Sequence, residues 1–155
     1  MLILILRHGE AEARNGESER HITERGSAQV NSVLGWAKQM GVRVDSILSS
    51  PVARAKETAS LASAIFGPKL AVTNALEPEG SPEEVYEELA RLEPSKSVLL
   101  VSHQPLVSKL VEDILESAAP INMMTGSLAM VMAKDLPARG RGMLVSLIPP
   151  FLANS

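Results

Sequence analysis

The chain begins with Met1-Leu-Ile-Leu-Ile-Leu-Arg-His-Gly-Glu10, and this stretch decides how the rest can fold. The apolar run from Leu2 to Leu6 is too short for a helix and does not alternate, so it predicts a central parallel strand buried on both faces. The strand ends at Arg7 and His8, followed by a glycine that permits a tight turn. Ligands in open α/β sheets bind just beyond the carboxyl ends of strands, so this Arg-His pair is well placed to meet an anion. The alternative is an ordinary charged loop.

The remaining chain alternates between helical and strand patterns. Thr23 is expected to cap a helix that Gly41 stops, and Ser50 and Ser81 are expected to cap two later helices. Expected helices cover 24–40, 51–66, 82–92 and 105–115; expected strands cover 42–48, 69–73, 97–102, 127–133 and 143–148; 74–81 is expected to be a loop. The last two strands predict a hairpin at the sheet edge. This order predicts an α/β fold, a three-layer α/β/α sandwich around a mostly parallel sheet with an antiparallel edge.

Composition limits the classes of function. With 155 residues, we expect one domain over 1–155. A net charge of −3 without a basic run argues against a nucleic-acid partner, and the absence of cysteine excludes disulfides and thiolate metal sites. The N-terminal apolar run has no basic leader, and no stretch approaches the ~20 apolar residues that span a bilayer. We therefore expect a cytoplasmic protein with no membrane partner.

Four basic side chains are candidates for one anion site. Arg7 and His8 follow the first strand, Arg54 lies in the first turn of the helix after the second strand, and His103 follows a later strand. Parallel strands end on the same side of a sheet, so these residues can converge. Two guanidiniums match the oxygens of a phosphoryl group, and neighbouring positive charge keeps an imidazole neutral and nucleophilic. A second imidazole can stabilise charge that develops on an equatorial oxygen.

Each candidate also has a purely structural explanation. Arg54 alone fits a solvated helix position, and His103 fits a loop residue or helix cap. Arg7 can pair with Glu10 or Glu12. We interpret His21, which has no strand end before it, as a surface loop residue. The constellation is stronger evidence than any of its members.

Three motifs carry a resemblance to a known family. Leu6-Arg-His-Gly-Glu10, Ser49-Ser-Pro-Val-Ala-Arg-Ala-Lys-Glu-Thr58 and Val101-Ser-His103 resemble, in this order, the signatures of the histidine phosphatase superfamily, also called phosphoglycerate mutase-like. The similarity covers nearly the whole chain. Two further segments, Arg20-His-Ile-Thr-Glu-Arg-Gly26 and Ser102-His-Gln-Pro-Leu-Val107, are similar to the bacterial SixA-type phosphohistidine phosphatases.

The resemblance implies a role for each matched residue. His8 would be the nucleophile that becomes phosphorylated, and Arg7, Arg54 and His103 would complete the phosphate pocket. Arg20 would add a further phosphate contact. The implied fold is phosphoglycerate mutase-like, and the implied chemistry needs no metal or cofactor.

The proton donor is open at this level. Many superfamily members place a glutamate in the loop after the third strand, where Glu77 falls, whereas SixA-type relatives often lack a carboxylate there. The alternatives are that Glu77 is an exposed loop acid, or that Glu10 donates from a poor position beside His8. A nitrogen leaving group needs less help from an acid than an alkoxide does.

Three functions remain in competition. The first is a phosphatase that acts on a protein phosphohistidine, such as a histidine phosphotransfer domain, or on a small phosphoester, with inorganic phosphate as product. The second is a phosphoglycerate mutase-type phosphotransferase, which the absence of inserted closing segments disfavours. The third is a non-catalytic phosphate-binding module. The acidic stretch 80–93 is interpreted as a solvated face rather than a docking site.

Overall fold

β1 (Leu2–Arg7) lies inside the sheet, between β4 (Ser97–Ser102) and β5 (Leu128–Ala133). The computed structural model describes residues 1–151 and 153, and these residues form a six-stranded sheet in the order β3-β2-β4-β1-β5-β6. β1 pairs in parallel with β4 and antiparallel with β5. The remaining elements are α1 (Glu24–Gln39), β2 (Ser46–Ser49), α2 (Ala53–Phe66), β3 (Leu70–Val72), the 3₁₀ turn η1 (Asn74–Leu76), α3 (Pro82–Leu89), α4 (Leu106–Leu115) and β6 (Gly142–Ile148).

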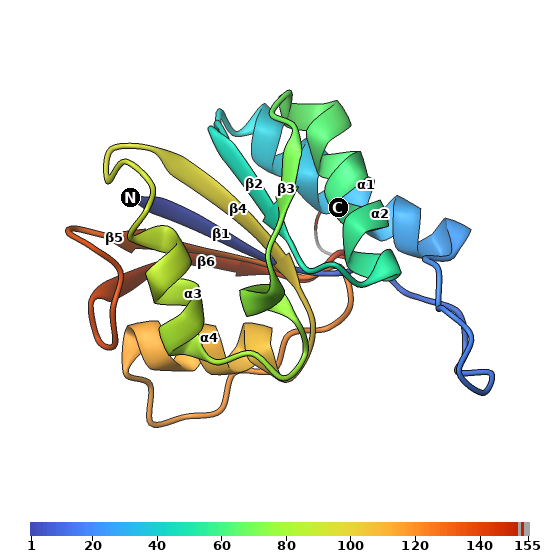
Figure 1. Cartoon of the computed structure of the whole chain (residues 1–155). Helices are drawn as coiled ribbons and strands as arrows, with labels where there is room; N and C mark the ends of the chain where they lie inside the picture. Colours follow the sequence, from blue (N-terminus) through green and yellow to red (C-terminus); the bar gives the residue numbers. More distant parts are fainter. Residues whose placement is uncertain (152, 154–155) are drawn as a thin grey trace.

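Two layers of helices cover the two faces of the sheet (Figure 1). Side chains of β1 alternate between the two cores: Ile3 and Ile5 pack on the side of α3 and α4, and Leu4 and Leu6 pack on the side of α1 and α2. All four are fully buried. The doubly buried strand and the three-layer sandwich predicted from the sequence are both confirmed. The β5–β6 hairpin at the antiparallel edge is confirmed as well.

Two predicted boundaries are wrong near the start of β2 and the end of α3. Residues 42–45 were expected in the strand, but the Val42 N–H bonds back to Ala37 and the ladder with β4 begins only at Ser46. α3 ends at Leu89 rather than 92, since the chain turns there and Pro94 follows. The strand expected over 97–102 has those bounds in the structure, and the remaining strands and helices differ from their expected bounds by at most two residues at either end.

Two of the three predicted helix caps are confirmed and the third is wrong. Thr23 caps α1, and Ser81 caps α3 in a reciprocal capping box with Glu84. Ser50 does not cap α2: the helix begins at Ala53 with Val52 as its uncapped N-cap residue. The Ser50 hydroxyl instead accepts from the Val52 N–H and contacts His103.

The segment expected to be a loop over 74–81 contains the 3₁₀ turn η1, which Thr73 caps. The difference arises because Thr73 accepts a hydrogen bond from the Ala75 N–H and so starts a turn. Leu76 at its end is buried in the core, which anchors the segment below the carboxyl end of β4. Within the described part of the chain, no helix is long and apolar enough to cross a bilayer.

Candidate active site

The backbone around Arg7 and His8 is held by the strands on either side. The His8 N–H donates to Ser102 O at the end of β4 over 3.0 Å, and the Arg7 N–H donates to Ser127 O over 3.1 Å. The Gly126 N–H donates to the carbonyls of both Arg7 and His8. The carboxyl end of β1 is therefore a rigid platform, which is the position expected for a ligand site in such a sheet.

Gly9 turns the chain tightly against the start of α1. A Cβ added to Gly9 would lie 2.6 Å from Gly26 O, and a Cβ added to Gly26 would overlap Glu10 O. The Gly9 N–H donates to Thr58 Oγ1 over 3.1 Å, and the Thr58 hydroxyl donates to Arg54 O over 2.8 Å. This close approach connects the loop after β1 to both α1 and α2.

His8 presents an unprotonated nitrogen. Its Nδ1 lies 2.7 Å from Gly9 O, and because a carbonyl only accepts, Nδ1 carries the proton. Nε2 is thereby left with a lone pair, and Arg54 Nε donates to it over 3.2 Å. The pKa of His8 is lowered to about 4, by burial first and also by the charges of Arg54, Arg7 and Arg20, against the raising effect of the Gly9 hydrogen bond. His8 is neutral at physiological pH, with burial as a larger cause than the arginines.

His103 lies beside His8. The two ring centroids are 5.1 Å apart with planes at 57°, and His103 is only 1% exposed. The pKa of His103 is lowered to about 3, by burial first and also by the charges of His8, Arg54 and Arg7. Its Nε2 lies 2.8 Å from Ser50 Oγ, while its Nδ1 is buried and finds no hydrogen-bond partner in residues 1–151 and 153.

Arg7 and Arg54 are held by different hydrogen-bond partners. Arg7 donates from NH1 to Met123 O over 2.8 Å, and its buried Nε has no partner among the described residues. Arg54 lies in the first turn of α2, as expected, and contacts His8. Burial lowers the pKa of both guanidiniums, and the charge of Arg20 lowers both further. Positive charge concentrated beside two neutral imidazoles favours an anion.

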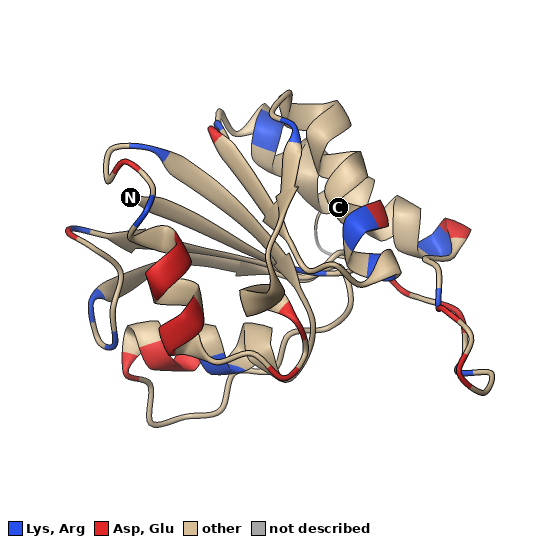
Figure 2. Ribbon diagram, in the orientation of Figure 1, with Lys and Arg blue, Asp and Glu red and all other residues tan. Residues whose placement is uncertain are grey.

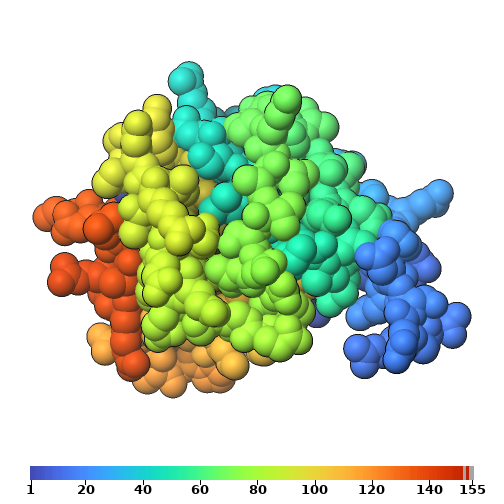
Figure 3. Space-filling model, viewed as in Figure 1, coloured from blue at the N-terminus to red at the C-terminus, as the bar shows by residue number. Residues whose placement is uncertain are grey.

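Arg20 belongs to a loop that stands out from the body of the molecule (Figures 1 and 3). Arg20 Nε donates to Glu12 O over 2.7 Å, and Ala11 and Ile22 form an isolated bridge at the base of the loop. The Arg20 charge acts on Arg7, His8 and Arg54. His21 on the same loop is exposed and bonds to Glu57, in agreement with its interpretation as a surface residue.

The candidate donors are less closely associated with the pocket. Glu10 turns toward the start of α1, where it accepts from the Thr23 hydroxyl and pairs with Arg25 over 3.3 Å. Glu77 is half-buried at the end of η1, and its side chain forms no hydrogen bond or ion pair within the described residues. The acid whose charge acts on Arg54 is Glu79, which the sequence analysis did not single out.

The alternative role of Arg7, as an ion-pair partner of Glu10 or Glu12, is not seen in the described part of the chain. Arg7 donates to a carbonyl instead, and Glu10 is paired with Arg25.

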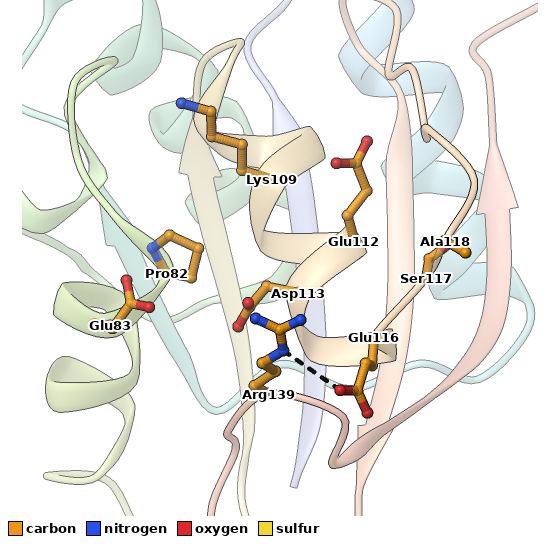
Figure 4. Close-up of a pocket in the computed structure, with 9 residues that line it drawn as sticks. All are labelled: Pro82, Glu83, Lys109, Glu112, Asp113, Glu116, Ser117, Ala118 and Arg139. Carbon is orange, nitrogen blue, oxygen red and sulfur yellow. Dashed lines mark ion pairs between the residues drawn. The ribbon is translucent and has the colours of Figure 1, made fainter.

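A separate groove between α3 and α4 is not part of this site (Figure 4). Three of its acids are engaged in contacts of the fold: Asp113 accepts from the Tyr86 hydroxyl, Glu112 accepts from the Ile121 N–H, and Glu116 pairs with Arg139. Figure 2 shows that acidic residues gather on these two helices. No group of three or more metal-ligating side chains occurs in residues 1–151 and 153.

The structure brings Arg7, His8, Arg54 and His103 together, and the charge of Arg20 acts on the first three. Within the described residues, Glu77 forms no hydrogen bond or ion pair with them. It adds two side chains that the sequence analysis did not assign to the site, Ser50 and Thr58. Both lie in the motif that contains Arg54, and their hydroxyl chemistry is the signal that would have found them.

Comparison with known proteins agrees with this geometry. A family model described as histidine phosphatase superfamily (branch 1) matches residues 3–77. A phosphohistidine phosphatase SixA homolog of Haemophilus influenzae is 35% identical over 144 residues, which cover 85% of this chain and 88% of that protein. Phosphohistidine phosphatase SixA of Escherichia coli is 32% identical over 136 residues, 84% of each chain.

Comparison with solved structures points to the same family. A solved structure of the protein histidine phosphatase SixA complexed with tungstate has a TM-score of 0.87 and 28% identity, and the match covers 98% of this chain and 99% of that one. The phosphoglycerate mutase-like fold implied by the motifs is thereby confirmed. The chain belongs to the histidine phosphatase superfamily and, within it, to the SixA-type enzymes.

Proposed function

We propose that this chain is a phosphohistidine phosphatase in which Nε2 of His8 is the nucleophile. The observation that carries the proposal is the hydrogen-bond arrangement of His8: Gly9 O takes the Nδ1 proton, so that the lone pair on Nε2 is turned toward Arg54. Burial favours the neutral imidazole, which is the reactive form. The arginines supply the positive charge that a metal ion supplies in other phosphoryl-transfer enzymes.

The proposed reaction has two displacements at phosphorus. In the first, Nε2 of His8 forms a P–N bond while the P–N bond of the substrate breaks, and the leaving imidazole nitrogen takes a proton. Arg7 and Arg54 neutralise the phosphoryl oxygens, and His103 donates to an equatorial oxygen as charge shifts. In the second, water attacks phosphorus, gives up a proton, and releases inorganic phosphate with neutral His8 regenerated.

Glu77 is the first candidate for the proton donor, and Glu79 is the matched competitor. Glu77 is half-buried and lies on the loop that the superfamily uses for this purpose; Glu79 is more exposed, but its charge acts on Arg54. Water serves as the donor if neither acid is needed, because an imidazole leaves more readily than an alkoxide.

The partner we propose is a phosphorylated protein, such as a histidine phosphotransfer domain, in the cytoplasm. The loop that carries Arg20 projects from the body of the molecule (Figure 3), and a phosphohistidine on a protein surface would approach His8 beside this loop. Small phosphoesters are the second substrate class. A phosphoglycerate mutase-type transferase gains no specific support, and we propose that residues 1–155 act as one catalytic domain.

The test is phosphate release, without added metal, from a chemically phosphorylated histidine protein and from p-nitrophenyl phosphate. Wild type is compared with His8→Ala, Glu77→Gln and Glu79→Gln. Loss of both activities in His8→Ala, with phosphohistidine preferred and both glutamates dispensable, supports the proposal. Ester hydrolysis that collapses in one glutamate variant identifies the donor and indicates a small-molecule phosphatase. Full activity in His8→Ala would overturn the mechanism.

A further inference from the structure

The contact between Ser50 and His103 has a consequence for the tautomer of His103. Ser50 is fully buried at the carboxyl end of β2, and its Oγ lies 2.8 Å from Nε2 of His103. The Val52 N–H donates to the same oxygen over 3.2 Å. The Val52 N–H therefore occupies one acceptor site of the Ser50 hydroxyl, and the hydroxyl proton is free to be donated to another group.

Within residues 1–151 and 153, the only acceptor in contact with the Ser50 hydroxyl is Nε2 of His103. A serine hydroxyl has one proton to donate, and a buried donor is costly to leave unpaired. If Ser50 donates to Nε2, that nitrogen carries a lone pair and the imidazole proton must be on Nδ1. The opposite arrangement would leave the Ser50 proton without an acceptor in the described part of the chain.

Binding of the substrate also requires the proton of His103 to be on Nδ1. Nδ1 of His103 is the buried ring nitrogen without a partner, and its ring lies 5.1 Å from that of His8. A phosphoryl oxygen placed between the imidazoles and the arginines is an acceptor, so it is attracted by an N–H and repelled by a nitrogen lone pair. The phosphoryl group therefore requires a lone pair on Nε2 of His8 and a proton on Nδ1 of His103. Both rings carry their proton on Nδ1, but they meet the phosphoryl group with different nitrogens.

We propose that Ser50 is a positioning residue, which donates to Nε2 of His103 and so keeps a proton on Nδ1 for the phosphoryl oxygen. The inference rests on the proposed function, because it assigns His103 its part in that reaction. It also explains why Ser50 does not cap α2, since its hydroxyl is committed to Val52 and His103. Ser50 itself acts through His103 and makes no contact with the reacting atoms.

The first measurement needs no variant. In ¹⁵N NMR spectra of the histidine side chains, a protonated ring nitrogen and one with a lone pair have well separated chemical shifts. The chain has only three histidines, so assignment is direct. At pH 7 we expect His103 to be protonated at Nδ1 and unprotonated at Nε2. Protonation at Nε2 instead would overturn the inference, even in a fully active enzyme.

The variant test compares Ser50→Ala with Ser49→Ala. Ser49 is an equally buried neighbour whose hydroxyl donates to Ser50 O and, within the described residues, forms no hydrogen bond with His103. Ser50→Ala should give a mixture of His103 tautomers and a kcat about tenfold lower, with a smaller change in KM, because one hydrogen bond that selects the tautomer is lost. Ser49→Ala should keep the Nδ1–H tautomer.

The inference fails if Ser50→Ala keeps the wild-type tautomer, or if its kcat falls no further than that of Ser49→Ala. An inactive wild-type protein whose His103 has the expected tautomer would overturn the proposed function instead. The two failures are therefore distinguishable, since one is read from the spectrum and the other from turnover.

Discussion

Arg54 donates a hydrogen bond from Nε to Nε2 of His8 over 3.2 Å, across 46 positions of sequence. The contact aligns a guanidinium of the site with the nitrogen that has the free lone pair. When a phosphoryl group enters, the guanidinium can exchange this nitrogen for phosphoryl oxygens while His8 attacks. In the proposed mechanism, the same arginine orients the nucleophile before reaction and neutralises charge during it.

The contact between Arg54 and His8 predicts that substitutions at the two residues lower kcat by different amounts. His8→Ala removes the nucleophile and should lower kcat by about 10⁴-fold or more. Arg54→Lys retains the positive charge but loses the planar guanidinium and its paired hydrogen-bond donors. It should lower kcat by roughly 10²- to 10³-fold, as when one transition-state donor is removed. Single-turnover phosphate release measures both. Lys56→Arg, an exposed change on the same helix, is the control and should leave kcat unaltered.

The three histidines should titrate at different pH. Burial lowers the pKa of His8 to about 4 and that of His103 to about 3, whereas the hydrogen bond and charge of Glu57 raise the pKa of His21 above its usual 6.5. As pH falls from 8 to 5, His21 should take up a proton and the two pocket histidines should remain neutral. Side-chain NMR titration measures this directly, and His8 or His103 titrating near 6.5 would contradict the burial argument.

Gly26 and Gly35 lie in the same helix and should respond to alanine with opposite signs. A Cβ at Gly26 overlaps the backbone oxygen of Glu10, so Gly26→Ala should lower the free energy of unfolding by about 1–3 kcal/mol. A Cβ at Gly35 meets no atom within 4 Å, and Gly35→Ala should raise it by up to ~1 kcal/mol through helix propensity. Urea denaturation tests both. Stabilisation by both changes would show that the contact between Gly26 and Glu10 is not rigid.

Thr58 should matter through its hydroxyl rather than its methyl group. Thr58→Val leaves the buried Gly9 N–H without its acceptor, which should lower the free energy of unfolding by about 1–3 kcal/mol and displace the loop that supports His8. Thr58→Ser retains the acceptor and should keep both stability and kcat close to wild type. Equal losses in the two variants, measured by urea denaturation and turnover, would assign the effect to side-chain packing instead.

Much of the fold could be predicted from the sequence because hydrophobic pattern is a local signal. The continuous apolar runs of β1 and β4 need no partner to be recognised as doubly buried strands. Thr23 and Ser81 were recognised as caps because capping is decided within one turn. The start of β2 was misplaced because it depends on where β4 begins to pair, which is not a local property.

The chain by itself determined which residues are chemically suited to hold a phosphoryl group, and that Arg7, His8, Arg54 and His103 follow strand ends or begin a helix. Only the tertiary structure decided how they are used. The protonated nitrogen of His8 depends on Gly9 O, and the Ser50 hydroxyl faces His103 instead of α2. Gly9 is adjacent to His8, but Ser50 lies 53 positions from His103 and the elements that bury both rings are far apart in sequence, so the tautomers and the lowered pKa values depend on the folded chain. Residue identity supplies the chemistry of the site, and its protonation state is a property of the fold.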